Sequence, residues 1–167
     1  NIIVENASKA YIFFTTENSF NGFQRHPALE GKEYKDACLK MLESVSAIDY
    51  KTLKKAHLDD FTALFSRVSL DLGTDNKGDI PTNKRLIKHD KGAKDIALYT
   101  LIFNFGRYLI VSASREGTQA TNLQGIWNQD LIPAWFCDYT ININTQMNYW
   151  LTGPCNLDEI AKPLVKL

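Results

Sequence analysis

The sequence predicts a mostly helical fold with a short β segment at its front. Apolar residues recur at helical spacing in two segments that begin at Glu33 and Asp49. The strongest helical pattern covers residues 93–114. Residues 10–16 are instead β-branched and aromatic, which is typical of a buried strand. Because one strand cannot form a sheet, we interpret residues 10–16 as the end of a sheet whose other strands lie upstream.

The first half of the chain contains two expected helices and the loops around them. A polar loop is expected at residues 21–31. In the first helix, Cys38 lies on the apolar stripe and is expected to be a small buried hydrophobe. Asp49 is expected to cap the second helix, whose stripe consists of Tyr50, Leu53, His57, Phe61, Leu64 and Val68. Residues 70–81 form an expected linker, which is punctuated by Gly73, Asn76 and Gly78.

The second half begins with the strongest helix, and Gly117 follows its end. Its apolar face consists of Leu98, Leu101, Ile102, Phe105, Leu109 and Ser112. A long non-helical passage with Pro133 follows. A short helix is expected to begin near Asn144 or Thr145, and a further one at Asn156 or Asp158, where acidic residues suit the positive end of a helix.

Composition places the chain among ordinary globular proteins. Hydrophobic residues make up 44% of 167, and 19 basic residues balance 19 acidic ones. Such a chain has no net field that attracts nucleic acid or an anionic membrane, and no apolar run approaches the roughly 20 residues that span a bilayer. Three cysteines without paired spacing and three scattered histidines predict no metal and no cofactor. No signal peptide is visible at the start of the chain. Because the chain has no initiator Met and stops at Leu167 inside an expected helix, we expect an excised piece of a longer protein.

Residues 122–150 hold most of the functional information. They contain all three tryptophans together with eight side-chain amides, Asn122, Gln124, Asn128, Gln129, Asn142, Asn144, Gln146 and Asn148. Amides donate and accept hydrogen bonds, and an indole offers a flat apolar face. This pairing suits a neutral sugar better than a phosphate or a hydrophobic ligand. The alternative is a polar-rimmed aromatic cluster in the core.

Five residues of this segment have two interpretations each. Asn142 and Asn144 would project to the same side of extended backbone and hold a water, or they cap the following helix. Since an amide is not basic near neutral pH, a carboxylate elsewhere would have to activate that water. Asp138 would orient a sugar hydroxyl or bond its own loop. Trp127 and Trp135 would form a stacking wall or belong to the core.

The motifs of the last third resemble those of a known family. The residues concerned are Ser114, Arg115, Gly117, Thr118, Asn122, Leu123, Gln124, Gly125, Ile126, Trp127 and Asn128, then Pro133, Trp135, Asp138, Tyr139, Asn142, Asn144, Gln146, Met147, Asn148, Tyr149 and Trp150. Together they closely resemble glycoside hydrolase family 95, which comprises inverting α-L-fucosidases and α-L-galactosidases. The resemblance implies that residues 1–24 end an N-terminal β-sandwich, residues 25–88 form a helical linker, and residues 89–167 supply the opening helices of an (α/α)6 barrel.

The resemblance also implies roles for single residues. Asn142 and Asn144 match the pair that holds the attacking water in this family, and Thr140, Trp127, Trp135 and Asp138 would bind substrate. The general acid and the base lie downstream of Leu167 in relatives, so neither role falls to Asp138, Asp158 or Glu159. Many fucosidases of the family carry His where this chain has Thr140. The smaller Thr140 leaves space for the extra hydroxyl of L-galactose and is expected to shift preference toward L-galactosides.

The expected partners are an oligosaccharide with terminal L-fucose or L-galactose and the missing C-terminal part of the barrel. Nucleic acid and membranes are not expected partners, and the parent protein is expected to be secreted or periplasmic. Residues 1–167 alone should show no turnover, because acid and base are absent. Two alternatives remain, a non-catalytic carbohydrate-binding or scaffolding fragment and a helical interaction protein unrelated to sugars.

Overall fold

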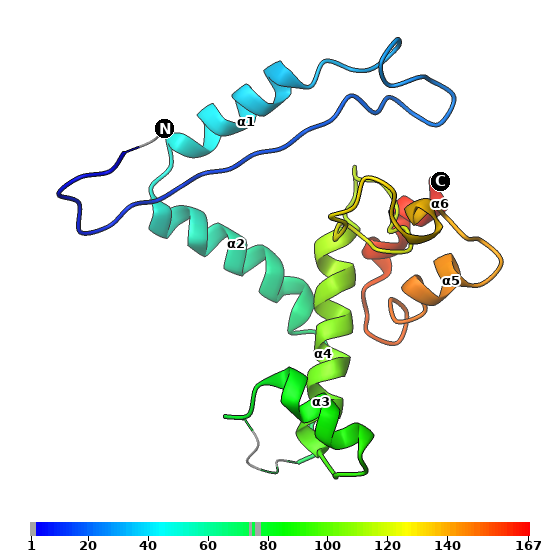
Figure 1. The fold of residues 1–167 in the computed structure, drawn as a ribbon. Coiled ribbons are helices and arrows are strands. Elements are labelled where there is room, and N and C mark those ends of the chain that lie inside the picture. Colours follow the sequence, from blue (N-terminus) through cyan, green and yellow to red (C-terminus); the bar gives the residue numbers. More distant parts are fainter. Residues whose placement is uncertain (1–2, 74, 76–77) are drawn as a thin grey trace. The chain divides into compact units, whose positions relative to one another are not determined.

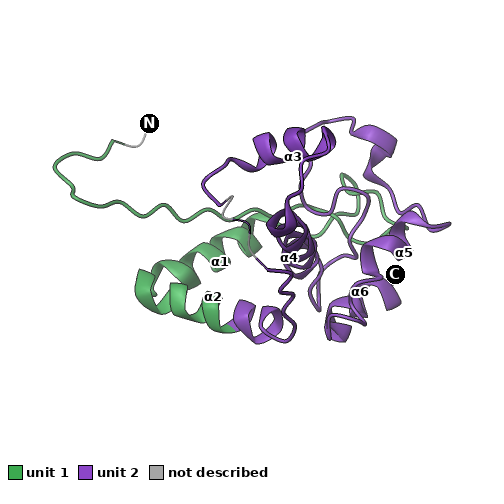
Figure 2. Ribbon diagram, turned by 90° about the horizontal axis from the view of Figure 1, so that it is seen from below, with its two compact units in different colours: residues 1–59 green, residues 60–167 purple. Residues whose placement is uncertain are grey.

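The computed structural model describes residues 3–73, 75 and 78–167. The chain divides into two compact units, residues 1–59 and 60–167, which are described separately (Figure 2). The described residues contain helices and no strand, which confirms the prediction of a mainly helical chain. The α-helices are Lys35–Ser46 (α1), Tyr50–Phe65 (α2), Thr82–Asp90 (α3), Ile96–Ala113 (α4), Asn144–Tyr149 (α5) and Lys162–Val165 (α6), and the 3-10 turns are Ala134–Cys137 (η1) and Asp158–Ala161 (η2) (Figure 1).

The first unit holds α1 and the beginning of α2. None of its described residues is buried, since α1 finds no apolar layer within this unit to cover its stripe. Cys38 is only half-buried, so the prediction of a buried Cys38 is wrong. The cap of α2 is confirmed, because Oδ1 of Asp49 accepts the N–H groups of Lys51 and Thr52 at 3.0 and 3.2 Å. Such a cap satisfies donors that the first turn leaves unpaired.

Residues 10–16 form no strand, so the prediction of a buried strand there is wrong. They follow a long irregular path (Figure 1), and Phe14 is 84% exposed. The hydroxyl of Thr15 donates to the carbonyl of Cys38 at 3.4 Å, which is not a ladder hydrogen bond. β-Branched and aromatic residues become a strand only when a neighbouring backbone pairs with theirs. No such partner lies among residues 3–73, 75 and 78–167.

The core of the second unit gathers around the C-terminal half of α4. Ile110 and Val111 of this helix are 4% and 2% exposed. Burying a side chain of this kind contributes about 1.5–3 kcal/mol. The buried cluster consists of Leu64, Ile110, Val111, Ala120, Tyr149, Cys155, Leu157 and Ile160. The end of α2, helix α4 and the C-terminal segment therefore share one core.

A buried ion pair sets the start of α4 and links it to α3. Asp95 caps α4 by accepting the N–H of Leu98 at 2.9 Å. Both oxygens of Asp95 also accept from the guanidinium of Arg85, at 2.9 and 2.7 Å, and this hydrogen bonding raises the pKa of Arg85. The helix begins at Ile96 rather than at residue 93, because the cap and not the apolar pattern decides the first turn. Of the linker expected before α3, Asn76 lies outside the described residues.

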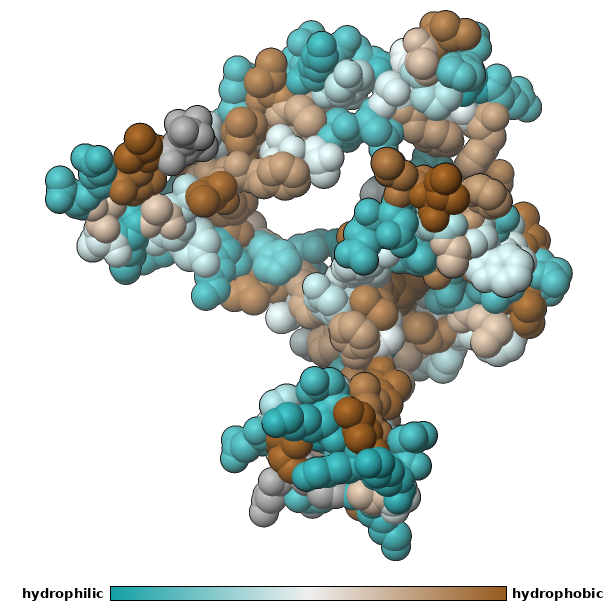
Figure 3. Space-filling view, in the orientation of Figure 1, coloured by the Kyte–Doolittle hydropathy of each residue, from teal (hydrophilic) through white to brown (hydrophobic). Residues whose placement is uncertain are grey.

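Helix α4 is, in the described part of the chain, the one helix that is long and apolar enough to cross a bilayer by length and composition. A core helix of a globular domain meets the same criteria. Near its middle, Arg107 is 1% exposed and donates to the carbonyl of Phe65. Cζ of Arg107 lies 4.3 Å from the centre of the Phe65 ring. Elsewhere on α4, Ile102 and Phe105 are exposed, and hydrophobic residues reach the surface at several places in Figure 3. The expectation of no membrane partner stays a prediction.

A buried chain of hydrogen bonds joins the C-terminal end of α4, the loop that follows it, α5 and η2. The N–H of Thr121 donates to the hydroxyl of Tyr149 at 2.7 Å, and that hydroxyl lies 2.8 Å from Oγ of Ser114. Oγ of Ser114 donates to the carbonyl of Ile160 at 2.8 Å. Since the single hydroxyl proton of Ser114 is used there, Tyr149 donates to Ser114, and each hydroxyl both accepts and donates. Ser114 and Tyr149 are 0% and 5% exposed, so the chain is shielded from water.

Ion pairs close the surface of the same unit. Arg67 donates to both carboxylate oxygens of Glu159, at 2.9 and 2.7 Å, and to the carbonyl of Asn156 at 2.8 Å. The side-chain hydrogen bond from Arg67 lowers the pKa of Glu159. Glu116 pairs with Lys162 at 2.9 Å, and this hydrogen bond likewise lowers the pKa of Glu116.

Replacing Tyr149 by Phe should lower the free energy of unfolding of the chain by about 1–3 kcal/mol, measured by urea unfolding. The ring stays in the core, but the N–H of Thr121 and Oγ of Ser114 lose their shared partner. Tyr108 is the matched control, because it is half-exposed and its hydroxyl has no hydrogen bond among the described residues. Tyr108→Phe should change the free energy of unfolding by less than about 0.5 kcal/mol. Equal effects of the two substitutions would contradict the buried chain.

The stability of the chain should fall when the pH drops below the pKa of a free glutamate, about 4.3. The pKa of Glu159 is lower in the folded chain than in the unfolded chain. The carboxylate of Glu159 therefore contributes fully to stability above its unfolded-state pKa, and this contribution is lost as the pH falls through its folded-state pKa. Glu159→Gln should therefore make the fall of Tm at acid pH less steep. The remaining fall includes the contribution of Glu116, whose pKa is also lowered. Asp158→Asn, next in the chain and without an ion pair among the described residues, serves as the matched control and should flatten the acid side less than Glu159→Gln does. An equally steep acid side in Glu159→Gln would count against this assignment.

Candidate active site

The chain leaves α4 through a tight turn that leads into the amide-rich segment, residues 122–150. Gly117 has φ +90°, a conformation that residues with a side chain rarely adopt. Oγ1 of Thr118 accepts the N–H of Arg115 at 3.0 Å, and the guanidinium of Arg115 donates to Asp60. These motif residues therefore shape and hold the turn.

Asn122 ties three parts of the segment together. Its Oδ1 accepts the N–H of Gln124 at 3.1 Å and the S–H of Cys137 at 3.0 Å. Its backbone carbonyl accepts a hydrogen bond from Nδ2 of Asn148 at 2.9 Å. The loop after α4, the turn η1 and helix α5 are thus joined at one residue.

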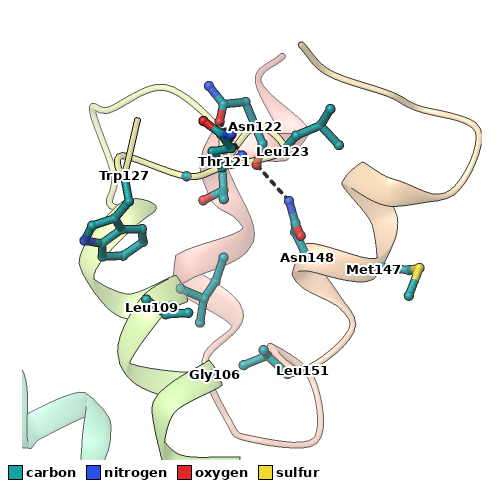
Figure 4. A pocket seen from close by; sticks show the side chains of 12 residues that line it. Gly106, Leu109, Thr121, Asn122, Leu123, Trp127, Met147, Asn148 and Leu151 are labelled. Atoms are coloured by element: carbon teal, nitrogen blue, oxygen red, sulfur yellow. Dashed lines mark hydrogen bonds between the residues drawn. The ribbon is translucent and has the colours of Figure 1, made fainter. Parts of the chain in front are cut away.

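A cavity of about 300 Å³ lies between α4, this loop and α5 (Figure 4). Trp127 forms part of its wall, together with the amide residues Asn122, Gln124 and Asn148. The other lining residues are mostly apolar: Gly106, Leu109, Ile110, Thr121, Leu123, Gly125, Met147 and Leu151. The structure therefore brings one indole and three amides of the segment together around one space.

Asn142 and Asn144 are exposed and do not line this cavity. The prediction of extended backbone through both is wrong, because residues 141–143 form a turn and Asn144 is the first residue of α5. The alternative that they cap α5 is also wrong, because Ile143 occupies the capping position without a side-chain cap hydrogen bond. Within the described residues neither amide side chain has a hydrogen-bond partner. Both are therefore available to a ligand.

The asparagine pair and the cavity are neighbours on α5. Asn144 and Asn148 are four residues apart in one helix, so their side chains leave the same side with Cβ atoms about 5–6 Å apart. Asn148 lines the cavity. Asn144 therefore stands one helical turn before the cavity wall.

Asp138 and Thr140 lie together at the surface, where the Thr140 hydroxyl donates to Oδ1 of Asp138 at 2.7 Å. The oxygen of Thr140 keeps lone pairs that can accept a hydrogen bond from a ligand. Burial raises the pKa of Tyr139 between them. Tyr139 therefore stays protonated, and its hydroxyl donates to the carbonyl of Ala120 at 2.9 Å.

Trp135 is 80% exposed on η1 and does not line the cavity. Trp135, Phe136 and Cys137 have φ angles of 55°, 52° and 54°, a left-handed run that costs L-residues roughly 1–2 kcal/mol each. The run leaves both aromatic side chains exposed to solvent. Across the described part of the chain no ring contact joins Trp135 to Trp127. The stacking wall of two indoles therefore does not form in this structure.

Apart from the indole N–H of Trp127, the polar side chains that line the cavity are three amides and the hydroxyl of Thr121. Among the described residues there is no group of three or more histidine, cysteine, aspartate or glutamate side chains that could hold a metal ion. Amides and hydroxyls bind neutral hydroxyl groups through hydrogen bonds in both directions.

Residues 49–167 match the glycosyl hydrolase family 95 catalytic domain, which covers more than half of the chain. The chain belongs to glycosyl hydrolase family 95. The resemblance carried by the motifs between Ser114 and Trp150 is thereby confirmed.

Three curated relatives of this family 95 chain carry fucosidase names. Alpha-L-fucosidase 2 of Arabidopsis thaliana is 36% identical over 165 residues, which cover 96% of this chain and 20% of the relative. Probable alpha-fucosidase A of Aspergillus niger is 30% identical over 167 residues, with 97% and 21% covered. The protein of the same name from Aspergillus oryzae is also 30% identical, with 96% and 23% covered. The chain spans about a fifth of the length of these relatives.

Sequence reasoning missed the cavity residues that lie outside residues 122–150, among them Gly106 and Thr121. A signal existed for Gly106, because a glycine inside the strongest helical pattern costs about 1 kcal/mol relative to alanine. No such signal marked Thr121, since its place in the cavity wall depends on the turn after α4.

Proposed function

We propose that this family 95 chain supplies the water-holding face of an exo-acting glycoside hydrolase, which removes terminal α-L-fucose or α-L-galactose with inversion. The observation that carries the proposal is the pair of exposed amides of Asn142 and Asn144, which have no protein partner in the described part of the chain. The place of Asn144 in α5, one helical turn before Asn148 in the wall of a cavity lined by an indole and amides, supports it. The fucosidase names of the three relatives support the substrate class.

In the proposed mechanism, the two amide oxygens accept hydrogen bonds from one water and aim its oxygen at the anomeric carbon. Because an amide is not basic near neutral pH, one of the two protons of that water passes to a carboxylate beyond the amides as the water oxygen bonds to the anomeric carbon. A second carboxyl group protonates the leaving oxygen, and inverting glycosidases hold the two carboxyl groups roughly 6.5–9.5 Å apart. We place both carboxyl groups in the rest of the catalytic domain. Glu159 suits neither role, since Arg67 already holds both of its oxygens.

Four further residues are proposed to bind the substrate. Asp138 and Thr140 would receive sugar hydroxyls at the surface where they already hydrogen-bond each other. Trp127 would line the sugar from the cavity side, and the exposed indole of Trp135 would contact it from η1.

We also propose the domain organisation that the family implies. Residues 89–167 would form the opening helices of an (α/α)6 barrel, residues 25–88 a helical linker, and residues 1–24 the end of a β-sandwich. The exposed apolar side chains of Ile102 and Phe105 on α4 support a partner layer from the rest of the barrel.

A second candidate function is carbohydrate binding without catalysis. The cavity beside Trp127 favours it, because that cavity does not depend on Asn142 or Asn144. The two candidates differ in turnover. Under either one, residues 1–167 alone should release no sugar, so hydrolysis by this piece would contradict both.

In a protein that carries this chain together with the rest of the catalytic domain, Asn142→Ala or Asn144→Ala should lower kcat on the order of 100-fold or more, with little change in KM. Each substitution removes one oxygen that positions the water. Release of L-fucose or L-galactose measures the rate. Gln129→Ala is the matched control, since this exposed amide of the same segment has no assigned role and should keep kcat within about twofold. Full activity in both asparagine variants would overturn the mechanism.

Replacing Thr140 by His in the same protein should raise the ratio of kcat/KM for α-L-fucoside over α-L-galactoside by roughly tenfold. The larger ring would fill the space that the extra hydroxyl of L-galactose needs. Nitrophenyl glycosides of the two sugars provide the assay. Thr140→Ser keeps the hydroxyl and should leave the ratio nearly unchanged. A strong fucoside preference in the unaltered enzyme would refute the role of Thr140.

A further inference from the structure

A glycine in the middle of α4 keeps the floor of the cavity open. A Cβ placed on Gly106 would meet no atom within 4 Å, although this residue lines the cavity. Glycine inside a helix is less stable than alanine. Since neither a left-handed φ nor a close contact requires glycine here, the space above Gly106 is the physical consequence of its missing side chain.

Two buried polar atoms in the cavity wall lack a hydrogen bond within the described structure. They are Oγ1 of Thr121 and Oε1 of Gln124, and Thr121 is 9% exposed. An unpaired buried polar group destabilises the folded chain. Oε1 of Gln124 can only accept, and Oγ1 of Thr121 can accept or donate. Both atoms would be satisfied by hydroxyl groups of a ligand.

The remaining walls suit the apolar faces of a sugar ring. The indole of Trp127 is held against the backbone at Gly125, where an added Cβ would lie 3.0 Å from Cε3 and Cζ3 of the indole. Leu109 and Leu151 add apolar surface to the same cavity (Figure 4). A pyranose has C–H groups on its faces and hydroxyls at its rim, which matches an apolar cavity with a few polar atoms.

We propose that this cavity is a subsite for one pyranose ring of a neutral glycan, with its hydroxyls bonded to Thr121 and Gln124. Because Asn142 and Asn144 do not line the cavity, this ring is the neighbour of the one that the water attacks. The separation of one helical turn between Asn144 and Asn148 spans adjacent sugars. The inference rests on the proposed function for the identity of the glycan. An apolar side chain from the rest of the catalytic domain would fill the apolar part but would leave the two acceptors unpaired.

The first test measures sugar binding to the chain by tryptophan fluorescence and saturation-transfer NMR. The probes are methyl α-L-fucopyranoside, methyl α-L-galactopyranoside and methyl β-D-galactopyranoside, with acyclic sorbitol as the control ligand. We expect saturable binding of at least one pyranoside and a loss of at least about tenfold in affinity for Gly106→Leu, which fills the cavity. Gly153→Leu is the matched control, since Gly153 lies outside the cavity and its Cβ also meets nothing within 4 Å. No binding of any pyranoside, or equal affinity of both variants, overturns the proposal.

The second test removes one hydroxyl without changing the size of the side chain. Thr121→Val should leave Tm unchanged or raise it, because an unpaired hydroxyl is lost, and should weaken pyranoside binding roughly fivefold. Thr121→Ser should restore most of the affinity. Undiminished affinity in Thr121→Val contradicts a ligand role for this hydroxyl.

A third test separates this inference from the proposed function. In a protein with the complete catalytic domain, Gly106→Leu should raise KM for an oligosaccharide about tenfold more than for a nitrophenyl monoglycoside, which has no second sugar ring. If the asparagine variants lose turnover while Gly106→Leu changes KM equally for both substrates, the proposed function is supported and the subsite is contradicted. If Gly106→Leu lowers Tm of the complete domain and leaves sugar binding intact, the cavity seats a protein side chain and the subsite also fails.

Discussion

The hydrogen-bond chain from Thr121 through Tyr149 and Ser114 to Ile160 is the constraint on which the second unit depends. It pairs the buried N–H of Thr121 and the buried carbonyl of Ile160, and buried backbone groups of this kind need such partners. Two hydroxyls are stable in this core because each accepts one bond and donates another. The chain anchors the loop after α4 to α5, and the cavity exists between these two anchored parts.

The side-chain amides of this protein fall into two groups, those that hydrogen-bond within the protein and those that remain exposed. Both atoms of Asn122 that accept hydrogen bonds are used inside the protein, so its amide builds the loop. The amides of Asn142, in the turn before α5, and of Asn144, the first residue of α5, have no partner among the described residues and remain exposed. Amide-rich composition by itself indicated a sugar site but could not separate the residues that hold the loop from those that remain available.

The second unit exposes apolar and aromatic side chains that the proposed larger catalytic domain would cover or use. The chain spans about a fifth of the length of its fucosidase-named relatives. Its α4 buries Ile110 and Val111 yet exposes Ile102 and Phe105, so the helix has a covered part and an uncovered apolar part. The left-handed run at η1 likewise exposes Trp135. In the proposed enzyme, such surfaces meet either other helices or the glycan.

Local chemistry determined much of this protein from the sequence alone: the apolar period located α4, Asp49 was recognisable as a cap, and the motifs from Ser114 to Trp150 identified the family. These features depend on residues close together in the chain. Tertiary structure alone decided the rest. Residues 10–16 have strand composition but no pairing partner among the described residues, and polar α3 is tied to α4 through the Arg85–Asp95 pair. The cavity joins residues up to 45 positions apart, between Gly106 and Leu151, and a sequence pattern cannot show which distant side chains will leave a space between them.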